Sequence, residues 1–130
     1  MDSHKLLEAK YRQIADAYLQ SLQTADLEGV LSLFDPQGIV ISPLYGQRPA
    51  PEFYRLLFRD TQHSETQVLD IMTNTQNKCL MVYFNYRWTL LKGEIASFDC
   101  VDLFRLNHDH KIESLRIIYD TFPIRPLISY

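Results

Sequence analysis

The spacing of the apolar residues changes near residue 60, and this change constrains the fold more than any other feature. Before it, apolar side chains recur every three or four residues, as on one face of a helix. After it, apolar and polar residues alternate in segments rich in β-branched and aromatic residues. These segments are residues 66–73, 79–91, 94–106 and 111–119. Helices followed by strands are typical of an α+β domain, in which helices cover one face of a sheet.

Three helices and one short strand are expected in the N-terminal half. Residues 4–23 carry a single apolar stripe. Asp26 is placed to cap a second helix, because its carboxylate can accept the free amide protons of the first turn. That helix ends before Pro36, which cannot continue the hydrogen-bond ladder. Residues 38–42 form a brief strand, and residues 51–59 form the third helix.

The breaks between the later strands fall at residue types that favour tight turns. They lie at residues 75–78, 92–93 and 107–110. Short turns between long strands indicate an antiparallel meander. The expected sheet therefore has about four long strands plus residues 38–42.

Length and composition exclude several classes of protein. A chain of 130 residues can bury one sizeable core, so residues 1–130 are expected to form one domain. The net charge is −3 and the basic residues form no cluster, which argues against a nucleic-acid surface. No apolar run approaches the roughly 20 residues of a membrane-spanning helix. The charged N-terminus lacks the apolar stretch of a signal peptide, so a cytoplasmic protein with reduced Cys79 and Cys100 is expected.

Two sequence runs carry a resemblance to a known superfamily. They are ADLEGVLSLFDPQGIVISPLYG, after the first helix, and DLFRLNHDHKIESLRIIYD, at the end of the chain. In this order they resemble nuclear-transport-factor-2-like proteins, and among those the SnoaL-like polyketide cyclases and the ketosteroid isomerases. The likeness runs from Tyr11 to Arg125. It implies a cystatin-like, cone-shaped roll with an apolar pocket at its open end, and a homodimer through the outer sheet face.

Asp102 is the first candidate for chemistry. Strand alternation places it on one face with Phe98, Cys100, Phe104 and Leu106. An isolated ionised carboxylate is costly there, so it must be paired, hydrogen-bonded or protonated. The resemblance aligns Asp102 with the protonated aspartate of the isomerases, which donates a hydrogen bond to an enolate oxygen. The alternative is a structural aspartate bonded to backbone amides or to an arginine.

Tyr18 is the second candidate. In the resembling isomerases the first helix ends on a tyrosine that is the other donor to the oxyanion, and the run AYLQSLQTADLEG matches it here. Two donors that converge on one oxygen stabilise a developing oxyanion. Tyr18 also lies on the core stripe of its helix, so it could instead fill the core.

The general base of the isomerases has no counterpart in this sequence. Their aspartate precedes a proline at the end of the first strand, where this chain has Ser42 and Pro43. A serine hydroxyl has no useful basicity at pH 7 without a partner. Asp120, at the end of the last strand, is the substitute we expect, with Asp70 as another. The alternative for Asp120, and the one that its place at the end of a strand favours, is a solvated residue or a cap.

The pocket is expected to have apolar walls and polar tips. Its candidate ligand-binding residues are Ser42, Tyr86, Trp88, Phe104 and Tyr119. Ordinary sheet core is the alternative for the aromatic residues. The histidines of residues 107–110 offer too few ligands for a metal site and fall in a turn, so no metal and no cofactor is expected.

Two functions are compatible with these residues. The first is a pocket that binds a small apolar carbonyl compound through Tyr18 and Asp102 and catalyses isomerisation, cyclisation or dehydration. The second is a non-catalytic, dimeric binding or assembly module whose pocket is filled by its own side chains.

Overall fold

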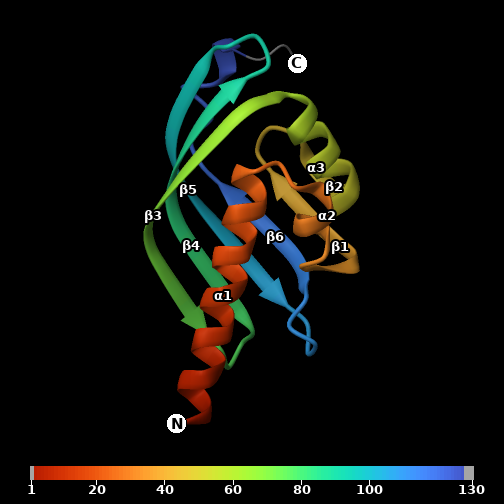
Figure 1. Ribbon diagram of the computed structural model, residues 1–130, viewed down its shortest axis with the longest axis vertical. Helices are drawn as coiled ribbons and strands as arrows, with labels where there is room; N and C mark the ends of the chain where they lie inside the picture. The colour runs from red at the N-terminus through yellow and green to blue at the C-terminus, as the bar shows by residue number, and fades with distance from the viewer. Residues whose placement is uncertain (1, 128–130) are drawn as a thin grey trace.

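A curved six-stranded sheet carries three helices on one face in the computed structural model, which describes residues 2–127 (Figure 1). In chain order the elements are α1 (Ser3–Gln23), α2 (Leu27–Leu31), β1 (Phe34–Ser42), β2 (Gly46–Pro49), α3 (Ala50–Arg59), β3 (Thr61–Asn74), β4 (Cys79–Leu90), β5 (Ile95–Leu106), β6 (Ile112–Ile118) and a 3₁₀ turn at Arg125–Leu127. The predicted α+β fold class and its three helices are confirmed.

The helices begin where the sequence supplies a cap or a proline. Asp2 accepts a hydrogen bond from the His4 amide and caps α1, and Asp26 accepts one from the Gly29 amide and caps α2. Pro51 lies in the first turn of α3, where its missing N–H is not needed. Each helix then buries one apolar stripe.

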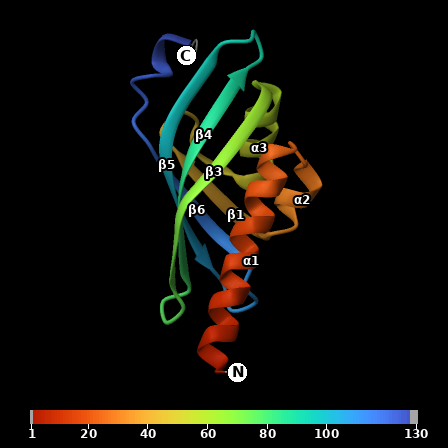
Figure 2. The same cartoon turned by 60° about the vertical axis from the view of Figure 1, so that its left-hand side comes forward.

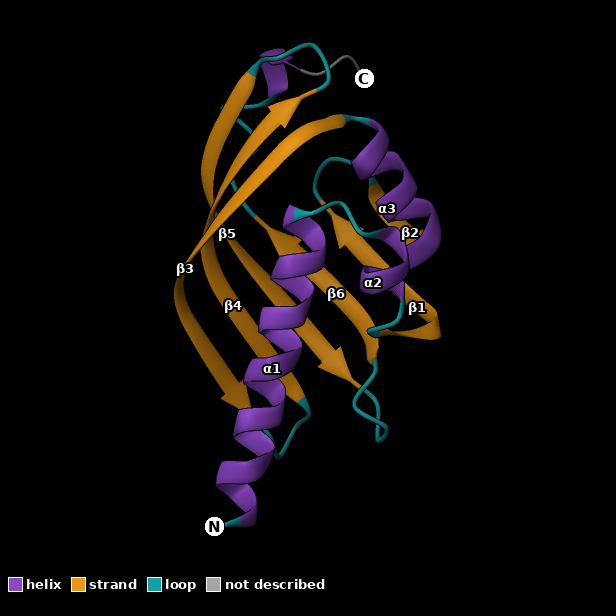
Figure 3. Cartoon of the chain, in the orientation of Figure 1, coloured by secondary structure: helices purple, strands orange, loops and turns teal. Residues whose placement is uncertain are grey.

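The strands follow the order β2-β1-β6-β5-β4-β3. All neighbours are antiparallel except β1 and β6, which are parallel. The helices lie on the concave side of the curved sheet, and α1 crosses it diagonally (Figures 2 and 3). The buried apolar residues between the two layers form one cluster.

Several elements differ from those expected, and β1 begins at Phe34 rather than at residue 38. Helix α2 ends at Leu31, and Pro36 lies inside β1, in an irregular stretch of its pairing with β6 where no ladder N–H is required. Strand β2 was not predicted, because its four residues have no apolar pattern. Strand β3 begins at Thr61 rather than at Thr66, since its first residues are polar and pair through their backbone.

The expected turns are present. Gly93 has a positive φ in the turn between β4 and β5, a conformation that glycine adopts without strain. In the turn before β6, Asn107 Oδ1 accepts hydrogen bonds from the amides of Asp109 and Lys111. Within residues 2–127, no helix combines the length and the apolar character needed to cross a membrane.

Candidate functional site

A cavity lies between the concave face of the sheet and the helices α1 and α3. Its lining consists of Tyr18, Leu22, Ser42, Leu44, Tyr45, Phe53, Leu57, Phe84, Tyr86, Trp88, Phe98, Cys100, Asp102, Ile117 and Tyr119. The lining is mostly apolar and aromatic, with few polar atoms, as is usual for small-ligand sites. It includes no lysine, arginine or histidine.

The cavity is narrow. The space open to the centre of a water molecule is about 40 Å³, which is room for about three waters. Aromatic rings occupy much of the interior: Phe98 stacks on Tyr119 with ring centroids 4.4 Å apart, and Tyr86 packs against Phe98. A ligand of several rings therefore enters only if side chains move.

Asp102 lies in the wall of this cavity, on β5, and is 2% exposed. One of its oxygens, Oδ1, accepts a hydrogen bond from the Cys100 thiol, with Sγ 3.2 Å away. Within residues 2–127 no cation pairs with this carboxyl. Burial disfavours the charged form and raises the pKa of Asp102 to about 7, although the Cys100 bond opposes the rise. At neutral pH the carboxyl is therefore protonated in about half of the molecules.

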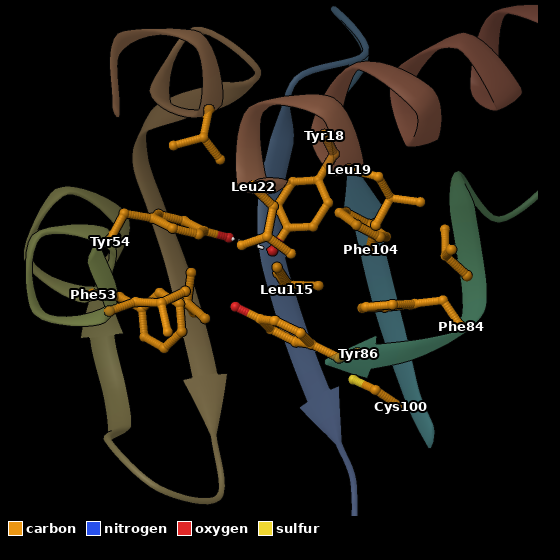
Figure 4. Packing of buried hydrophobic residues seen from close by; sticks show 14 of the residues in the cluster. Tyr18, Leu19, Leu22, Phe53, Tyr54, Phe84, Tyr86, Cys100, Phe104 and Leu115 are labelled. Carbon is orange, nitrogen blue, oxygen red and sulfur yellow. Dashed lines mark hydrogen bonds between the residues drawn. The ribbon is translucent and has the colours of Figure 1, made fainter. Parts of the chain in front are cut away.

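Tyr18 approaches the same cavity from α1 and is 1% exposed. Its hydroxyl is 2.8 Å from the hydroxyl of Tyr54, on α3 (Figure 4). Its ring packs edge-on against Phe104, with centroids 5.0 Å apart. Burial, together with the charges of Tyr54 and Asp102, raises the pKa of Tyr18 well above its ordinary value. Tyr18 therefore stays a neutral phenol that can donate a hydrogen bond.

Tyr86 brings another phenol to the cavity, from β4. Its hydroxyl points toward the space that the Tyr18 and Tyr54 hydroxyls face (Figure 4) and lies 2.8 Å from Ser64 Oγ. Trp88, two residues further along β4, donates its indole N–H to Thr61 Oγ1 at 2.8 Å. The polar atoms of these two residues therefore have protein partners.

The opening of the cavity is lined by half-buried residues. Among them are Leu44 and Tyr45, after β1, and Tyr119, after β6. Tyr45 donates its hydroxyl proton to Asp60 Oδ2 at 2.7 Å, and its amide donates to Ser42 Oγ at 2.8 Å. The Ser42 hydroxyl thus closes a turn at the rim.

Two predicted site residues do not line the cavity. Asp120 is exposed, and its carboxylate accepts a hydrogen bond from the Phe122 amide at 2.9 Å, as in a local turn. Phe104 is fully buried behind the Tyr18 ring. Asp70, the other substitute base, is exposed on β3. The remaining predicted residues all line the cavity: Tyr18, Ser42, Tyr86, Trp88, Asp102 and Tyr119.

Tyr54, whose hydroxyl bonds that of Tyr18, was not among the predicted site residues. A signal for it existed, since Ala50, Phe53, Tyr54 and Leu57 have the spacing of one buried helix face. Its partner on α1 could not be read from that spacing.

In residues 2–127 no three His, Cys, Asp or Glu side chains are grouped closely enough to hold a metal ion.

The fold is shared with many solved structures of low sequence identity. A nuclear-transport-factor-2-like protein of unknown function from Burkholderia pseudomallei is 18% identical, with a TM-score of 0.79 over 92% of this chain and 98% of that one. SalBIII, an epoxide hydrolase/cyclase-like enzyme with a role in pyran ring formation in the polyether salinomycin, is 15% identical, with a TM-score of 0.77 over 89% and 95%.

TerC, co-crystallised with polyporic acid, is 20% identical, with a TM-score of 0.76 over 90% of this chain and 96% of that one. No family model and no curated protein matches the sequence. The chain therefore has the nuclear-transport-factor-2-like fold that the resemblance implied.

Proposed function

We propose that this protein binds a small, largely apolar carbonyl compound in the cavity and stabilises its enolate through Tyr18 and Asp102, while a water molecule in the cavity accepts the proton that leaves the α-carbon. The reaction class is isomerisation, cyclisation or dehydration without a cofactor. The observation that carries the proposal is Asp102: a carboxyl with no cationic partner in the described chain, buried in the wall of an apolar cavity beside a buried phenol.

The chemistry follows from the protonation states. A neutral carboxylic acid donates a hydrogen bond, and a phenol with a raised pKa donates another. Both are more effective toward an oxygen that gains charge than toward a neutral carbonyl, since the surroundings exclude water. The lining formed by the described residues has no lysine, arginine or histidine, so it favours an uncharged ligand that becomes anionic only during the reaction. The cyclase-like SalBIII and the ligand-bound TerC share this fold and support small-molecule binding.

Binding of a phenol, which resembles an enol in shape and acidity, tests the oxygen site. Calorimetric titration at pH 6, where the phenol and the carboxylic acid are both neutral, is expected to show that Asp102→Ala weakens binding about 3- to 10-fold, through loss of one neutral hydrogen bond. The matched control is Asp99→Ala, an exposed aspartate on the opposite face of the same strand. Equal affinity of wild type and Asp102→Ala would refute the site.

A second candidate is the non-catalytic module. Two observations favour it: the small free volume, and the lack of an ionised base in the lining other than Asp102 itself. Exchange of the α-carbon protons of a ketone ligand in D₂O separates the candidates. Exchange accelerated by the wild type and lost in Asp102→Ala supports an enzyme, whereas binding without exchange supports the module. Asp120→Asn, tested alongside, is expected to exchange like the wild type.

We also propose that the protein is a homodimer through the outer sheet face. Two adjacent rows of apolar residues lie on that face, the first formed by Met72, Met81 and Leu103 and the second by Tyr83, Val101 and Ile118. Of these, Met72 and Ile118 are about half exposed. The resemblance implies the same face. A cytoplasmic location remains part of this proposal.

A further inference from the structure

The thiol of Cys100 and the carboxyl of Asp102 form a hydrogen-bonded pair in the cavity wall. They are two residues apart on β5, so both side chains point to the concave face. Each is 2% exposed, and the thiol donates its proton to Oδ1 over 3.2 Å. Burial and the Asp102 charge raise the pKa of Cys100 far above its ordinary value. Cys100 is therefore a thiol donor and not a nucleophile.

This bond makes the two carboxyl oxygens unequal. Oδ1 accepts the thiol proton, which is the role of the carbonyl oxygen in a protonated carboxyl group. Within residues 2–127, Oδ2 has no hydrogen-bond partner, and Asp102 lines the cavity. The acid proton is thus most stable on Oδ2.

We propose that Cys100 is a positioning residue for Asp102: it holds Oδ1 as the acceptor, so that the acidic proton lies on Oδ2, the oxygen free to meet a ligand. The consequence for ligand binding rests on the function proposed above. The pairing itself does not.

The groups around the carboxyl leave Cys100 as its only bonded partner in the described chain. Tyr18 on α1, Tyr54 on α3 and Tyr86 on β4 feel its charge, and all three are neutral phenols; Tyr119 also lines the cavity. On β6 its paired neighbour is Ile117, which has no polar side chain. Loss of the thiol therefore removes the one side-chain hydrogen bond that favours the ionised carboxyl.

The experiment is an NMR titration of the ligand-free protein labelled with ¹³C at the aspartate carboxyl carbon. Asp102→Asn identifies the Asp102 signal. We expect its midpoint in the wild type near pH 7. In Cys100→Ala the midpoint is expected about 0.5 to 1 pH unit higher, because the ionised form loses a donor. In Cys100→Ser, which keeps a donor, it is expected at or below the wild-type value.

Two further variants separate positioning from packing. Cys100→Val fills the space of the thiol without a donor and also covers the case in which the alanine variant fails to fold; its midpoint is expected to rise as well. Cys79→Ala removes the other free thiol and is expected to titrate like the wild type. A wild-type midpoint in Cys100→Val, or a raised midpoint in Cys100→Ser, would overturn the proposal.

The same variants connect the pair to ligand binding. At pH 6, phenol affinity is expected to fall about threefold in Cys100→Val and to return in Cys100→Ser. The NMR titration contains no ligand, so a failure of the proposed function leaves its result unchanged. If Cys100 does not hold Asp102 as proposed, the NMR titration shows it directly, because the midpoint does not change in Cys100→Val.

Discussion

At the scale of single residues, Asp102 makes the stability of the fold depend on pH. Its carboxyl has a pKa of about 7 when folded, against an ordinary value of 3.8. The folded state therefore holds this proton more tightly than the unfolded state. Its contribution to stability is greatest below about pH 4, falls as the pH rises toward 7, and is constant above that.

Comparison with Asp102→Asn isolates this contribution. Between pH 4 and pH 8 the wild type is expected to lose about 4 kcal/mol of unfolding free energy relative to the variant. Urea unfolding of both proteins across this range measures the difference. A difference that is constant with pH would show that Asp102 titrates at its ordinary value.

Tyr54→Phe tests the bond between the two buried phenols. The substitution leaves the Tyr18 hydroxyl without its partner, so the free energy of unfolding is expected to fall by about 1 to 2 kcal/mol. Tyr83→Phe is the control, because Tyr83 bonds Asp99 weakly, at 3.3 Å and on the exposed face. An equal decrease of the unfolding free energy in the two variants would mean that the Tyr18–Tyr54 hydrogen bond stabilises the fold no more than a weak surface hydrogen bond does.

The inward side of the strands could be predicted residue by residue. Alternation alone placed Asp102, Tyr86 and Trp88 on the buried face, because the direction of a side chain in a strand depends only on local backbone geometry. The partner of Tyr18 could not be predicted this way. It depends on how α3 packs against α1, which no local pattern specifies.

At the scale of elements, Gly38 permits the close approach of β1 to β6. A Cβ atom built there would lie 2.8 Å from the Ile112 carbonyl oxygen and 2.8 Å from the Phe34 ring. Backbone cannot move aside cheaply, so Gly38→Ala is expected to lower the unfolding free energy by about 2 kcal/mol or more. Gln37→Ala, at the exposed neighbouring position, is the control in the same urea experiment. Equal stability of the two variants would contradict the close approach.

The elements that the sequence predicted well are those with a strong period. Helix α1 and strands β4, β5 and β6 lie within a few residues of their expected bounds. The first residues of β3 and all of β2 are polar edge segments, which pair through backbone groups that every residue carries. Their pairing depends on the position of the neighbouring strands, so no pattern in their own side chains predicts it.

At the scale of the whole molecule, the proposed dimer is expected to sediment at twice 15.3 kDa. Leu103→Lys places a charge within the first of the two apolar rows and is expected to give a folded monomer. Leu6→Lys changes an exposed leucine on α1 and is expected to remain dimeric. Sedimentation equilibrium of the three proteins distinguishes a monomer from a dimer by mass. A monomeric wild type would refute the interface.

The strand order has a consequence for synthesis of the chain. The β1–β2 hairpin joins the remaining strands only through β6, which leaves the ribosome after all of them. While residues 50–111 are being translated, one edge of β1 has no partner strand. An unpaired edge of this kind can form hydrogen bonds with other chains and lead to aggregation. A nascent chain that stops before residue 112 therefore keeps this edge of β1 exposed, and the hazard of aggregation there ends only when β6 is added.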